Sequence, residues 1–281
     1  MTFTEKLQRA ITSSNSLLSI GLDPDPIKIP KSLRSQFPET EELVYEFCRR
    51  VIESTKICAG IYKINLGFFE ALGSAGWSIA EQLLEEIPHG KVTIADAKRG
   101  DIGTTAEKYR EAFFDQLQVD ALTLNPLMGL DTIEPFMNDE ERAVFILVLT
   151  SNRGSADFLQ QRFLGRMSLA EYIAEELNKK QALSKTHLGM VVGATQPRAS
   201  EPVLMAHPEA HLLIPGVGTQ GGDVVQLNDT LKNHRGIPII HSSRAIIYAG
   251  ADDENWEEQI TNKAIEMQQS IQPITDRYVK K

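Results

Sequence analysis

The chain has 281 residues, of which 42% are hydrophobic and 24% charged; this is the composition of an ordinary globular protein and excludes disordered and collagen-like classes. No apolar run approaches the roughly 18 to 20 residues of a membrane span, and residues 1–16 lack the apolar block of a secretory signal, so we expect a cytoplasmic protein without a membrane partner. The 29 basic and 38 acidic side chains give a formal charge of −9, which argues against nucleic acid as a partner, because that binding needs a basic face.

Eight short apolar runs with strand character follow one another along the chain. They span residues 17–22, 59–65, 91–96, 119–124, 144–150, 187–193, 210–215 and 237–243. Most of these runs are continuously apolar rather than alternating, which is typical of parallel strands that are buried on both faces.

Helical patterns lie between these runs. After Thr40, apolar residues recur every four positions from 43 to 51, and two early glutamates favour a helix start there through the helix dipole. Ser78 with Glu81, and Ser168 with Glu171, each fit a capping box, which predicts a helix start at both serines.

The alternation of strands and helices predicts the fold. Eight strand–helix repeats in a chain of this size indicate an α/β fold, a single (β/α)₈ TIM barrel over residues 1–281, with a doubly wound sheet as the alternative. The connections after strand one (23–39) and strand five (151–166) are longer than usual, so we expect both to lie on the active face. The two cysteines, Cys48 and Cys58, indicate neither a disulfide framework nor a metal site, and we expect buried free thiols.

Polar residues follow every predicted strand, at the end where this fold builds its active sites. They are Asp23, Lys63, Asp96 with Lys98, Asn125, Thr150 with Ser151, Thr195, the run PGVGTQGG from Pro215, and Ser243 with Arg244. Strand ends are exposed to solvent in any protein, so polar residues there can be present without a function. For Asn125 and Thr195 a turn or a cap is the better interpretation.

The last two strand ends favour a phosphate group. The run PGVGTQGGD contains four glycines whose backbone can approach an anion closely, and a helix is expected to begin at Asp223. Gln220 adds a hydrogen-bond donor and Arg244 a planar cation, and barrels frequently bind phosphate with the loops after strands seven and eight. Most glycine-rich turns are only turns, but the pairing with SSRAI favours phosphate binding.

The stretch DAKRGD carries the reactive charges. Residues two apart in an extended strand point the same way, so Asp96 and Lys98 are expected to face the same side, while Gly100 permits a turn and Asp101 begins the next helix. The alternative is a solvated ion pair worth about 0 to 1 kcal/mol. Lys63 at the preceding strand end makes an alternating array, in which each lysine keeps its proton. Two unit charges about 4 Å apart interact by roughly 4 kcal/mol at an effective dielectric near 20, so Asp96 disfavours a substrate carboxylate beside it and favours its loss as carbon dioxide.

With these residues the sequence resembles the orotidine 5′-phosphate decarboxylase family, in its longer-chain branch. The blocks SIGLDPDP, YKINLGFFE, TIADAKRGDIGTTAEKY, LTLNPLMG, LTSNRGS, VVGATQP, PGVGTQGGD and SSRAI occur in the family's order over nearly the whole chain. The resemblance implies a carboxy-lyase of pyrimidine biosynthesis that converts orotidine 5′-monophosphate to uridine 5′-monophosphate without a cofactor or metal, as a homodimer of barrels with shared active sites.

The family's roles transfer to matching positions. The resemblance implies that Lys98 protonates the pyrimidine carbon, that Asp96 lies against the departing carboxylate, and that Lys63 and Asp101 complete the charge array. The implied substrate-binding residues are Asp23 and Lys63 on the ribose, Ser151 on the pyrimidine edge, and Gln220, Ser243 and Arg244 towards the phosphate. Pro215 is a further implied substrate-binding residue, and Ile102 and Thr105, with Asp101, serve the neighbouring subunit's site. Many relatives have Gly-Arg where this chain has Ser243-Arg244.

Two other functions remain as alternatives. A metal-dependent keto-sugar phosphate decarboxylase or synthase of the same superfamily shares the D-x-K-x-x-D pattern, but it needs a glutamate for magnesium where this chain has Lys63. A non-catalytic phosphate-ligand sensor could keep the barrel and lose the chemistry, but the complete charge array argues against it.

Overall fold

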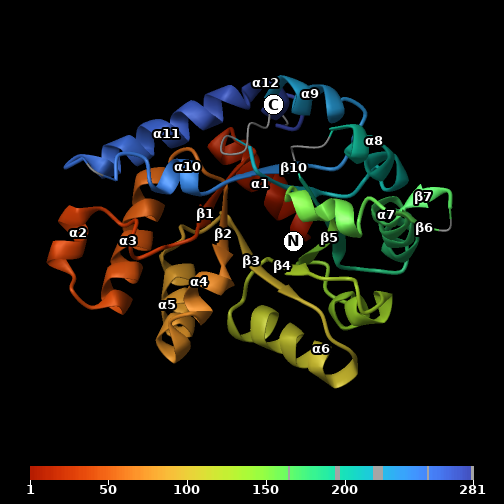
Figure 1. Cartoon of the computed structure of the whole chain (residues 1–281), viewed down its shortest axis with the longest axis horizontal. Coiled ribbons are helices and arrows are strands. Elements are labelled where there is room, and N and C mark those ends of the chain that lie inside the picture. Colours follow the sequence, from red (N-terminus) through yellow and green to blue (C-terminus); the bar gives the residue numbers. More distant parts are fainter. Residues whose placement is uncertain (164, 194–196, 218–223, 252, 280–281) are drawn as a thin grey trace. The chain divides into compact units, whose positions relative to one another are not determined.

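All eight predicted strands form, and in the computed structural model of the protein they are arranged as a closed barrel (Figure 1). The strand order around the barrel is β1-β10-β9-β8-β5-β4-β3-β2. The structure describes residues 1–163, 165–193, 197–217, 224–251 and 253–279. The fold is therefore the predicted (β/α)₈ barrel and not a doubly wound sheet.

The strands match the apolar runs closely. The barrel strands are β1 (Leu18–Leu22), β2 (Ile61–Asn65), β3 (Val92–Arg99), β4 (Ala121–Leu124), β5 (Ala143–Leu149), β8 (His187–Val192), β9 (Leu212–Pro215) and β10 (Pro238–Ser242). A separate antiparallel hairpin consists of β6 (Arg162–Phe163) and β7 (Met167–Ser168). β3 continues past its predicted end at residue 96 and reaches Arg99.

Helices alternate with the strands. The α-helices are α1 (Phe3–Ser14), α2 (Lys31–Gln36), α3 (Thr40–Thr55), α4 (Leu66–Glu70), α5 (Gly73–Glu86), α6 (Gly103–Arg110), α7 (Leu169–Gln181), α8 (Pro197–Ala206), α9 (Val224–Thr230), α10 (Arg244–Ile247), α11 (Trp256–Ser270) and α12 (Gln272–Thr275). A π-helical turn, η1 (Glu111–Gln116), and two 3₁₀ helices, η2 (Leu130–Phe136) and η3 (Arg153–Asp157), complete the set. Among the described residues, no helix is both long and apolar enough to cross a membrane.

The chain divides into two units, each made of two segments. Met1–Glu5 and Lys98–His241 form one, named here the Lys98–His241 unit. Lys6–Ala97 and Ser242–Lys281 form the other, named the Lys6–Ala97 unit. Ala97 and Lys98, adjacent in β3, thus belong to different units.

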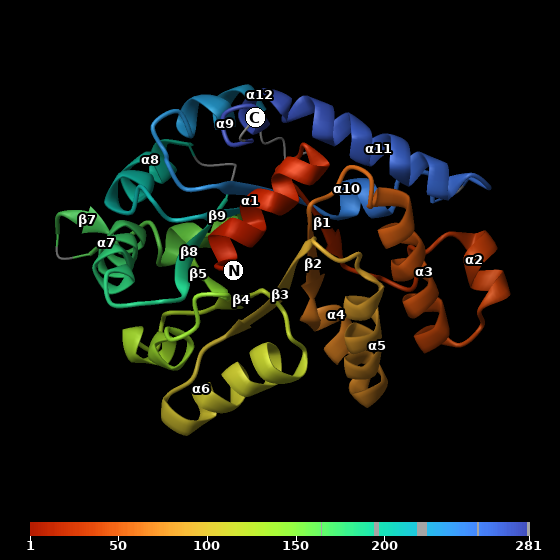
Figure 2. The ribbon, with the colours of Figure 1, turned by 180° about the vertical axis from the view of Figure 1, so that it is seen from behind.

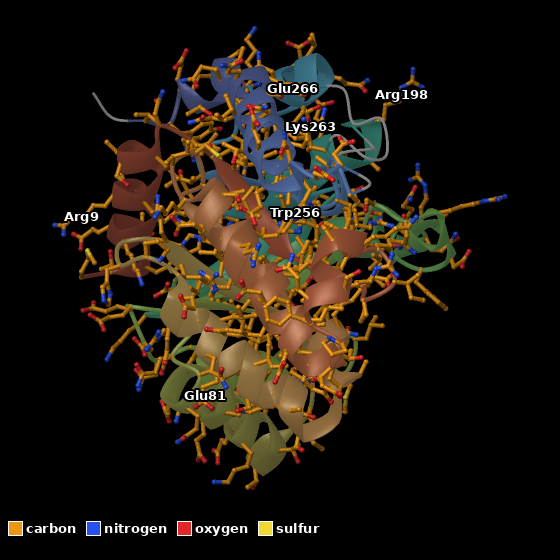
Figure 3. All side chains as sticks on the ribbon, turned by 90° about the vertical axis from the view of Figure 1, so that its left-hand side faces the viewer. Arg9, Glu81, Arg198, Trp256, Lys263 and Glu266 are labelled. Atoms are coloured by element: carbon orange, nitrogen blue, oxygen red, sulfur yellow. The ribbon has the colours of Figure 1, made fainter. Side chains whose placement is uncertain are left out.

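In the Lys6–Ala97 unit, α3 packs against both α5 and α11 (Figures 1 and 2). Phe47 of α3 stacks on the ring of Tyr248, with 5.8 Å between the ring centroids, and its centroid is also 5.8 Å from that of Trp256. Figure 3 labels Trp256 on α11 among the side chains of this face. These aromatic contacts fix the segment after β10 to α3.

In the Lys98–His241 unit, β5 and β8 are the central strands, with β4 and β9 as their outer neighbours. α7 packs against α8, and α8 against α9. The amino-terminal Phe3 is buried and contacts the rings of Phe145, His187 and His211. The hydrophobic effect, acting through the burial of these apolar faces, is the main force that holds the helices on the strands.

The structure distinguishes the two predicted capping boxes. Ser168 is the N-cap of α7, and its Oγ accepts a hydrogen bond from the Glu171 backbone N–H at 3.1 Å, which confirms the second box. The first prediction was wrong, because Ser78 lies inside α5, which already begins at Gly73. The preceding α4 ends at Glu70, and a turn of two residues connects it to α5. Both cysteines are buried free thiols, as predicted.

Candidate active site

The Lys6–Ala97 unit contains a buried ion pair between Lys63 and Asp96, on neighbouring strands. Lys63 Nζ on β2 lies 2.7 Å from Asp96 Oδ2 on β3, and the two side chains are 4% and 12% exposed. The parallel register aligns Asn65 with Asp96, so Lys63 reaches forward by two residues along its strand to form the pair. A lysine this deeply buried needs a charged partner, because the cost of burying it alone is several kcal/mol. The predicted proximity of these two charges is therefore present.

The loop after β1 is tied to the segment after β10. The Tyr248 hydroxyl donates to the Asp23 carbonyl at 2.8 Å and accepts from the Asp25 backbone N–H at 2.6 Å. Asp23 Oδ1 is buried and has no hydrogen-bond partner within the part of the chain that the structure describes. Buried carboxylate oxygens are rarely left without a donor, so this atom marks a place for a ligand donor such as a hydroxyl. Burial raises the pKa of Tyr248, which keeps its hydroxyl protonated.

Ser243 and Arg244 differ in burial and in the hydrogen bonds of their side chains. Ser243 is buried at the N-cap of α10, and its Oγ donates a long hydrogen bond of 3.4 Å to the Gly21 carbonyl on β1. Arg244 is exposed at the first position of α10. Among the described residues its guanidinium has no hydrogen bond or ion pair, so it is available for an anion.

Lys98 has an unusual backbone. Its φ is 49°, in the left-handed region that few non-glycine residues adopt, and its backbone N–H donates to Thr123 Oγ1 at 2.9 Å. The prediction that Asp96 and Lys98 share a side assumed an extended backbone, and that assumption fails at Lys98. Strained backbone of this kind costs on the order of 1–3 kcal/mol and is concentrated at functional sites. The Lys98 side chain is exposed.

The turn after β3 uses Gly100 for a different reason than predicted. Gly100 does not have a positive φ; a Cβ there would lie 2.6 Å from the Asn125 carbonyl oxygen. Asp101 does not begin the helix, because α6 starts at Gly103, and Asp101 Oδ1 instead accepts from the Ile102 N–H at 2.8 Å. Ile102 is 53% exposed. Thr105, in the first turn of α6, is exposed as well.

The remaining predicted residues lie at other strand ends of the Lys98–His241 unit. Ser151 follows β5, and its backbone lies so close to Gly193, at the end of β8, that a Cβ on Gly193 would be 2.6 Å from Ser151 Cα. Pro215 is the last residue of β9. Asn125 forms a turn, with its Oδ1 accepting from the Leu127 N–H at 3.1 Å, as its turn interpretation predicts. The predictions for Thr195, Gln220, Asp223 and the glycines at 218, 221 and 222 fall outside the described residues.

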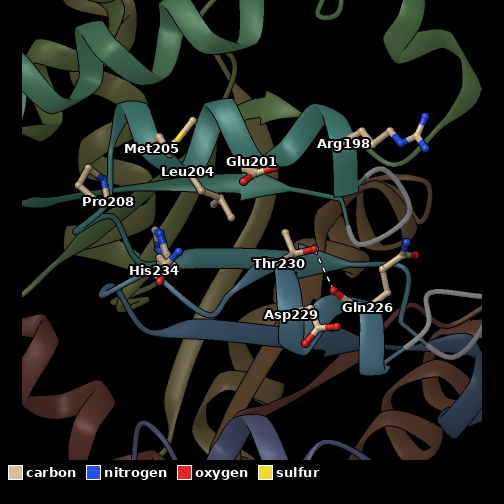
Figure 4. A pocket seen from close by; sticks show the side chains of 10 residues that line it. Arg198, Glu201, Leu204, Met205, Pro208, Gln226, Asp229, Thr230 and His234 are labelled. Atoms are coloured by element: carbon tan, nitrogen blue, oxygen red, sulfur yellow. Dashed lines mark hydrogen bonds between the residues drawn. The ribbon is translucent and has the colours of Figure 1, made fainter.

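A cavity of about 470 Å³ in the same unit is not part of this arrangement (Figure 4). It lies between α8 and α9, and its lining includes the apolar Leu204, Met205 and Pro208 and the acidic Glu201 and Asp229. None of its lining residues is a predicted site residue. The cavity is therefore separate from the candidate site residues.

Sequence analysis missed two residues that position the site. Tyr248 anchors the loop after β1, and Thr123 holds the Lys98 backbone. Tyr248 lies two residues after the end of the block SSRAI and offered no signal of its own. Thr123 lies within the apolar run 119–124, where a polar residue inside an apolar strand was the available signal. Their hydrogen-bond partners are distant in sequence, and for this reason the pattern alone did not identify them.

Comparison with known proteins identifies the family of the chain. The family model described as "Orotidine 5'-phosphate decarboxylase / HUMPS family" matches residues 16–259. An orotidine 5′-phosphate decarboxylase of Dehalococcoides mccartyi (strain CBDB1) is 39% identical over 99% of this chain and 100% of its own length. That of Roseiflexus sp. (strain RS-1) is 41% identical over 89% of this chain and 90% of its own.

Solved structures agree as well. The OMP decarboxylase of Leishmania donovani superposes with a TM-score of 0.82 and 32% identity, covering 98% of this chain and 99% of that one. A putative orotidine-monophosphate decarboxylase of Toxoplasma gondii gives a TM-score of 0.85 with 30% identity, covering 99% and 97% of the two chains. With the family model covering most of the sequence and these relatives covering nearly all of it, the chain belongs to the orotidine 5′-phosphate decarboxylase / HUMPS family.

Proposed function

We propose that the protein decarboxylates orotidine 5′-monophosphate to uridine 5′-monophosphate and carbon dioxide, without a cofactor. The observation that carries this proposal is the buried pair of Lys63 and Asp96. The metal-using members of the superfamily need a carboxylate where this chain has Lys63, and a protonated lysine repels a metal ion. A charge array built from two lysines and two aspartates instead suits a reaction that expels one anion and protonates a carbon.

The reaction breaks one bond and forms one. The bond between the pyrimidine ring carbon and its carboxylate breaks, the electron pair stays on the ring carbon, and carbon dioxide leaves. Lys98 gives an ammonium proton to that carbon. Asp96, held by Lys63, lies against the leaving carboxylate, and the cation of Lys98 stabilises the developing carbanion, which we expect to be the larger effect.

The other site residues bind the parts of the substrate that do not react. Asp23, whose buried Oδ1 has no donor among the described residues, accepts from a ribose hydroxyl. Arg244 binds the phosphate as a fork-shaped donor, together with Gln220 and the backbone N–H of Ser243, whose hydroxyl is directed to Gly21. Ser151 contacts the pyrimidine edge, and Pro215 is a further contact to the substrate. Binding energy from these remote contacts supports the transition state at the reacting carbon.

We further propose that the active form is a homodimer in which Asp101, Ile102 and Thr105 complete the neighbouring subunit's site. Ile102 is 53% exposed, and on the loop after β4 Leu127 and Met128 are 65% and 56% exposed. Large apolar side chains that are exposed on the loops after two neighbouring strands support an interface there. The dimer is of the closed two-fold kind, because the same surface serves both partners.

Ultraviolet spectroscopy tests the reaction. Protein treated with a chelator and then mixed with orotidine 5′-monophosphate should deplete the absorbance of that substrate, and Lys98→Ala protein should not. Activity that appears only after magnesium is added would instead support the metal-dependent keto-sugar phosphate enzyme. Binding without any turnover would support the phosphate-ligand sensor.

Mixing of variants tests the shared site. Lys98→Ala and Asp101→Ala proteins, each inactive alone, should regain about a quarter of wild-type activity after subunit exchange, because half of the dimers are mixed and each mixed dimer has one intact site. Lys98→Ala mixed with a second Lys98 variant, such as Lys98→Gly, is the control and should stay inactive. Exchange without recovery contradicts the role of Asp101 across the interface.

A further inference from the structure

A second cavity in the Lys98–His241 unit is lined by three arginines. Its volume is about 330 Å³, and its basic lining residues are Arg162, Arg166 and Arg198. This volume falls at the lower end of the roughly 300–1,000 Å³ of small-molecule sites. None of the residues assigned above to catalysis or substrate binding lines it.

The lining of this cavity contains three cationic side chains and one carboxylate. Glu171 is the acidic residue of the lining, so the charges around the cavity sum to +2, in a chain whose formal charge is −9. Glu171 Oε1 also accepts a hydrogen bond from Ser168 Oγ at 3.0 Å. Like charges gathered at one cavity raise the local positive potential, which favours the binding of an anion there.

No carboxylate among the described residues forms an ion pair with these three arginines. Elsewhere in this unit, Arg110 pairs with Asp115 at 2.6 Å and Lys180 with Glu134 at 2.7 Å. In the described part of the chain, by contrast, Arg162, Arg166 and Arg198 form no ion pair, and the hydrogen bond found for these guanidinium groups runs from Arg162 Nη1 to the Arg166 carbonyl at 3.4 Å.

The hairpin after β5 presents two of these arginines. β6 and β7 pair Arg162 with Ser168, so Arg166 lies in the turn between them. The base of the hairpin is fixed to α7, because the Leu169 N–H donates to the Gln161 carbonyl at 2.9 Å. These bonds hold the hairpin in place before any ligand arrives, which lowers the entropy cost of binding.

The third arginine belongs to the start of α8. Arg198 also borders the cavity between α8 and α9, but Figure 4 shows its guanidinium directed away from the other side chains of that cavity. Besides the charged residues, Leu149, Ala199 and Pro202 line the arginine-lined cavity, and they are named here its apolar wall. The cavity therefore combines planar cationic forks with apolar surface.

We propose that Arg162, Arg166 and Arg198 form a second anion site, which binds the oligophosphate group of a small molecule. Guanidinium forks match phosphate oxygens two at a time, and three of them suit several linked phosphates better than one. The apolar wall suits a nucleoside attached to that group. The site goes beyond the proposed reaction and does not depend on it.

Calorimetric titration with tripolyphosphate, in a buffer free of phosphate, tests the site. We expect one binding event per chain, weakened about tenfold or more by Arg162→Gln with Arg166→Gln, and weakened on raising the salt from about 50 to about 200 mM. Arg9→Gln with Lys185→Gln removes two exposed charges elsewhere and should leave binding unchanged. Arg198→Gln alone, at an exposed position, should weaken binding about threefold or more and repeats the test if the double variant does not fold.

The outcomes separate this site from the substrate site. Arg244→Gln should not affect tripolyphosphate binding; if it abolishes binding while the Arg162 and Arg166 substitutions do not, the probe occupies the proposed substrate site and the second site is wrong. No binding to the wild-type protein, or equal loss in the Arg9 and Lys185 control, also overturns the proposal. Adenosine triphosphate as a second probe distinguishes the ligands: binding at least as tight as tripolyphosphate assigns the apolar wall to a nucleoside, and weaker binding restricts the site to inorganic oligophosphate.

Discussion

Lys63 and Asp96 form an ion pair between neighbouring parallel strands, with 2.7 Å from Nζ to Oδ2 and almost no exposure of the lysine. The two residues are 33 positions apart in the chain, and the barrel register brings them together. A buried pair of this kind is weak evidence for stability, because desolvation offsets the attraction, but the loss of one partner leaves an uncompensated charge. Stability and function therefore respond differently to its removal.

The first prediction follows from that asymmetry. Asp96→Asn and Lys63→Met alone should each lower the free energy of unfolding by about 3–5 kcal/mol, whereas the double variant Lys63→Met with Asp96→Leu should lose clearly less. All three should lack decarboxylase activity. Denaturant unfolding and the absorbance assay measure the two properties. A double variant that is as unstable as the sum of the singles would contradict the interpretation of the pair as a functional device.

The second prediction concerns the left-handed backbone at Lys98. Lys98→Ala and Lys98→Gly should both abolish activity, since each removes the proton donor that we propose. The glycine variant should be more stable than the alanine variant by about 1 kcal/mol, because glycine adopts a φ of 49° without strain. Urea unfolding of the two variants measures this difference directly. Equal stability would show that the backbone at residue 98 relaxes when the lysine is removed.

The third prediction concerns the close approach of Gly193 to Ser151. Gly193→Ala places a methyl group within 2.7 Å of the Ser151 backbone nitrogen, so the loop after β5 must shift. Activity should fall about tenfold or more, because misplacement by about 1 Å is costly to catalysis. Gly154→Ala, in the same loop, would meet the Asn152 amide nitrogen at 3.1 Å, which is the end of a flexible side chain, and is the matched control. If both variants keep full activity, Ser151 does not contact the substrate.

The fourth prediction concerns a cluster of buried histidines. The His211 backbone N–H donates to His187 Nε2 at 2.8 Å, and the Ile237 N–H donates to His211 Nδ1 at 3.0 Å, so both rings are neutral when folded. Burial lowers the pKa of His187 to about 3 and that of His207 to about 4, and it lowers the pKa of His211 as well. Below a pH of about 6.5 the unfolded chain therefore binds more protons than the folded protein.

The direction of the pH effect on stability follows from this difference in bound protons. The stabilising contribution of these histidines is complete above about pH 6.5 and is lost as the pH falls towards their folded pKa values. Urea unfolding at pH 7 and pH 5 should show a drop in the free energy of unfolding, and His187→Gln should reduce that drop by about 2 kcal/mol. His89→Gln, in an exposed turn, is the control and should leave the drop unchanged. A drop that is the same in the His187 variant would assign the acid sensitivity to other groups.

Local features were predictable where the relevant contacts are local. The eight strands follow from continuous apolar runs, and the start of α7 follows from Ser168 and Glu171, which bond to each other three residues apart. Ser78 has the same spacing to its glutamate, yet it lies inside α5, because the packing of α4 on α5 begins the helix earlier. A three-residue pattern does not contain that tertiary contact.

The sequence by itself determined the order of strands and helices, the family and the residue types of the candidate site, because apolar periodicity, caps and motifs are encoded over short distances. Tertiary structure decided which charges meet and what holds them. The pairing of Lys63 with Asp96, the bond from Tyr248 to Asp23 and the support of Lys98 by Thr123 all join residues that are far apart in the chain. The same is true of the cavity that Arg198 shares with the hairpin after β5. Each depends on register and packing, and these are set only when the strands have closed into a barrel.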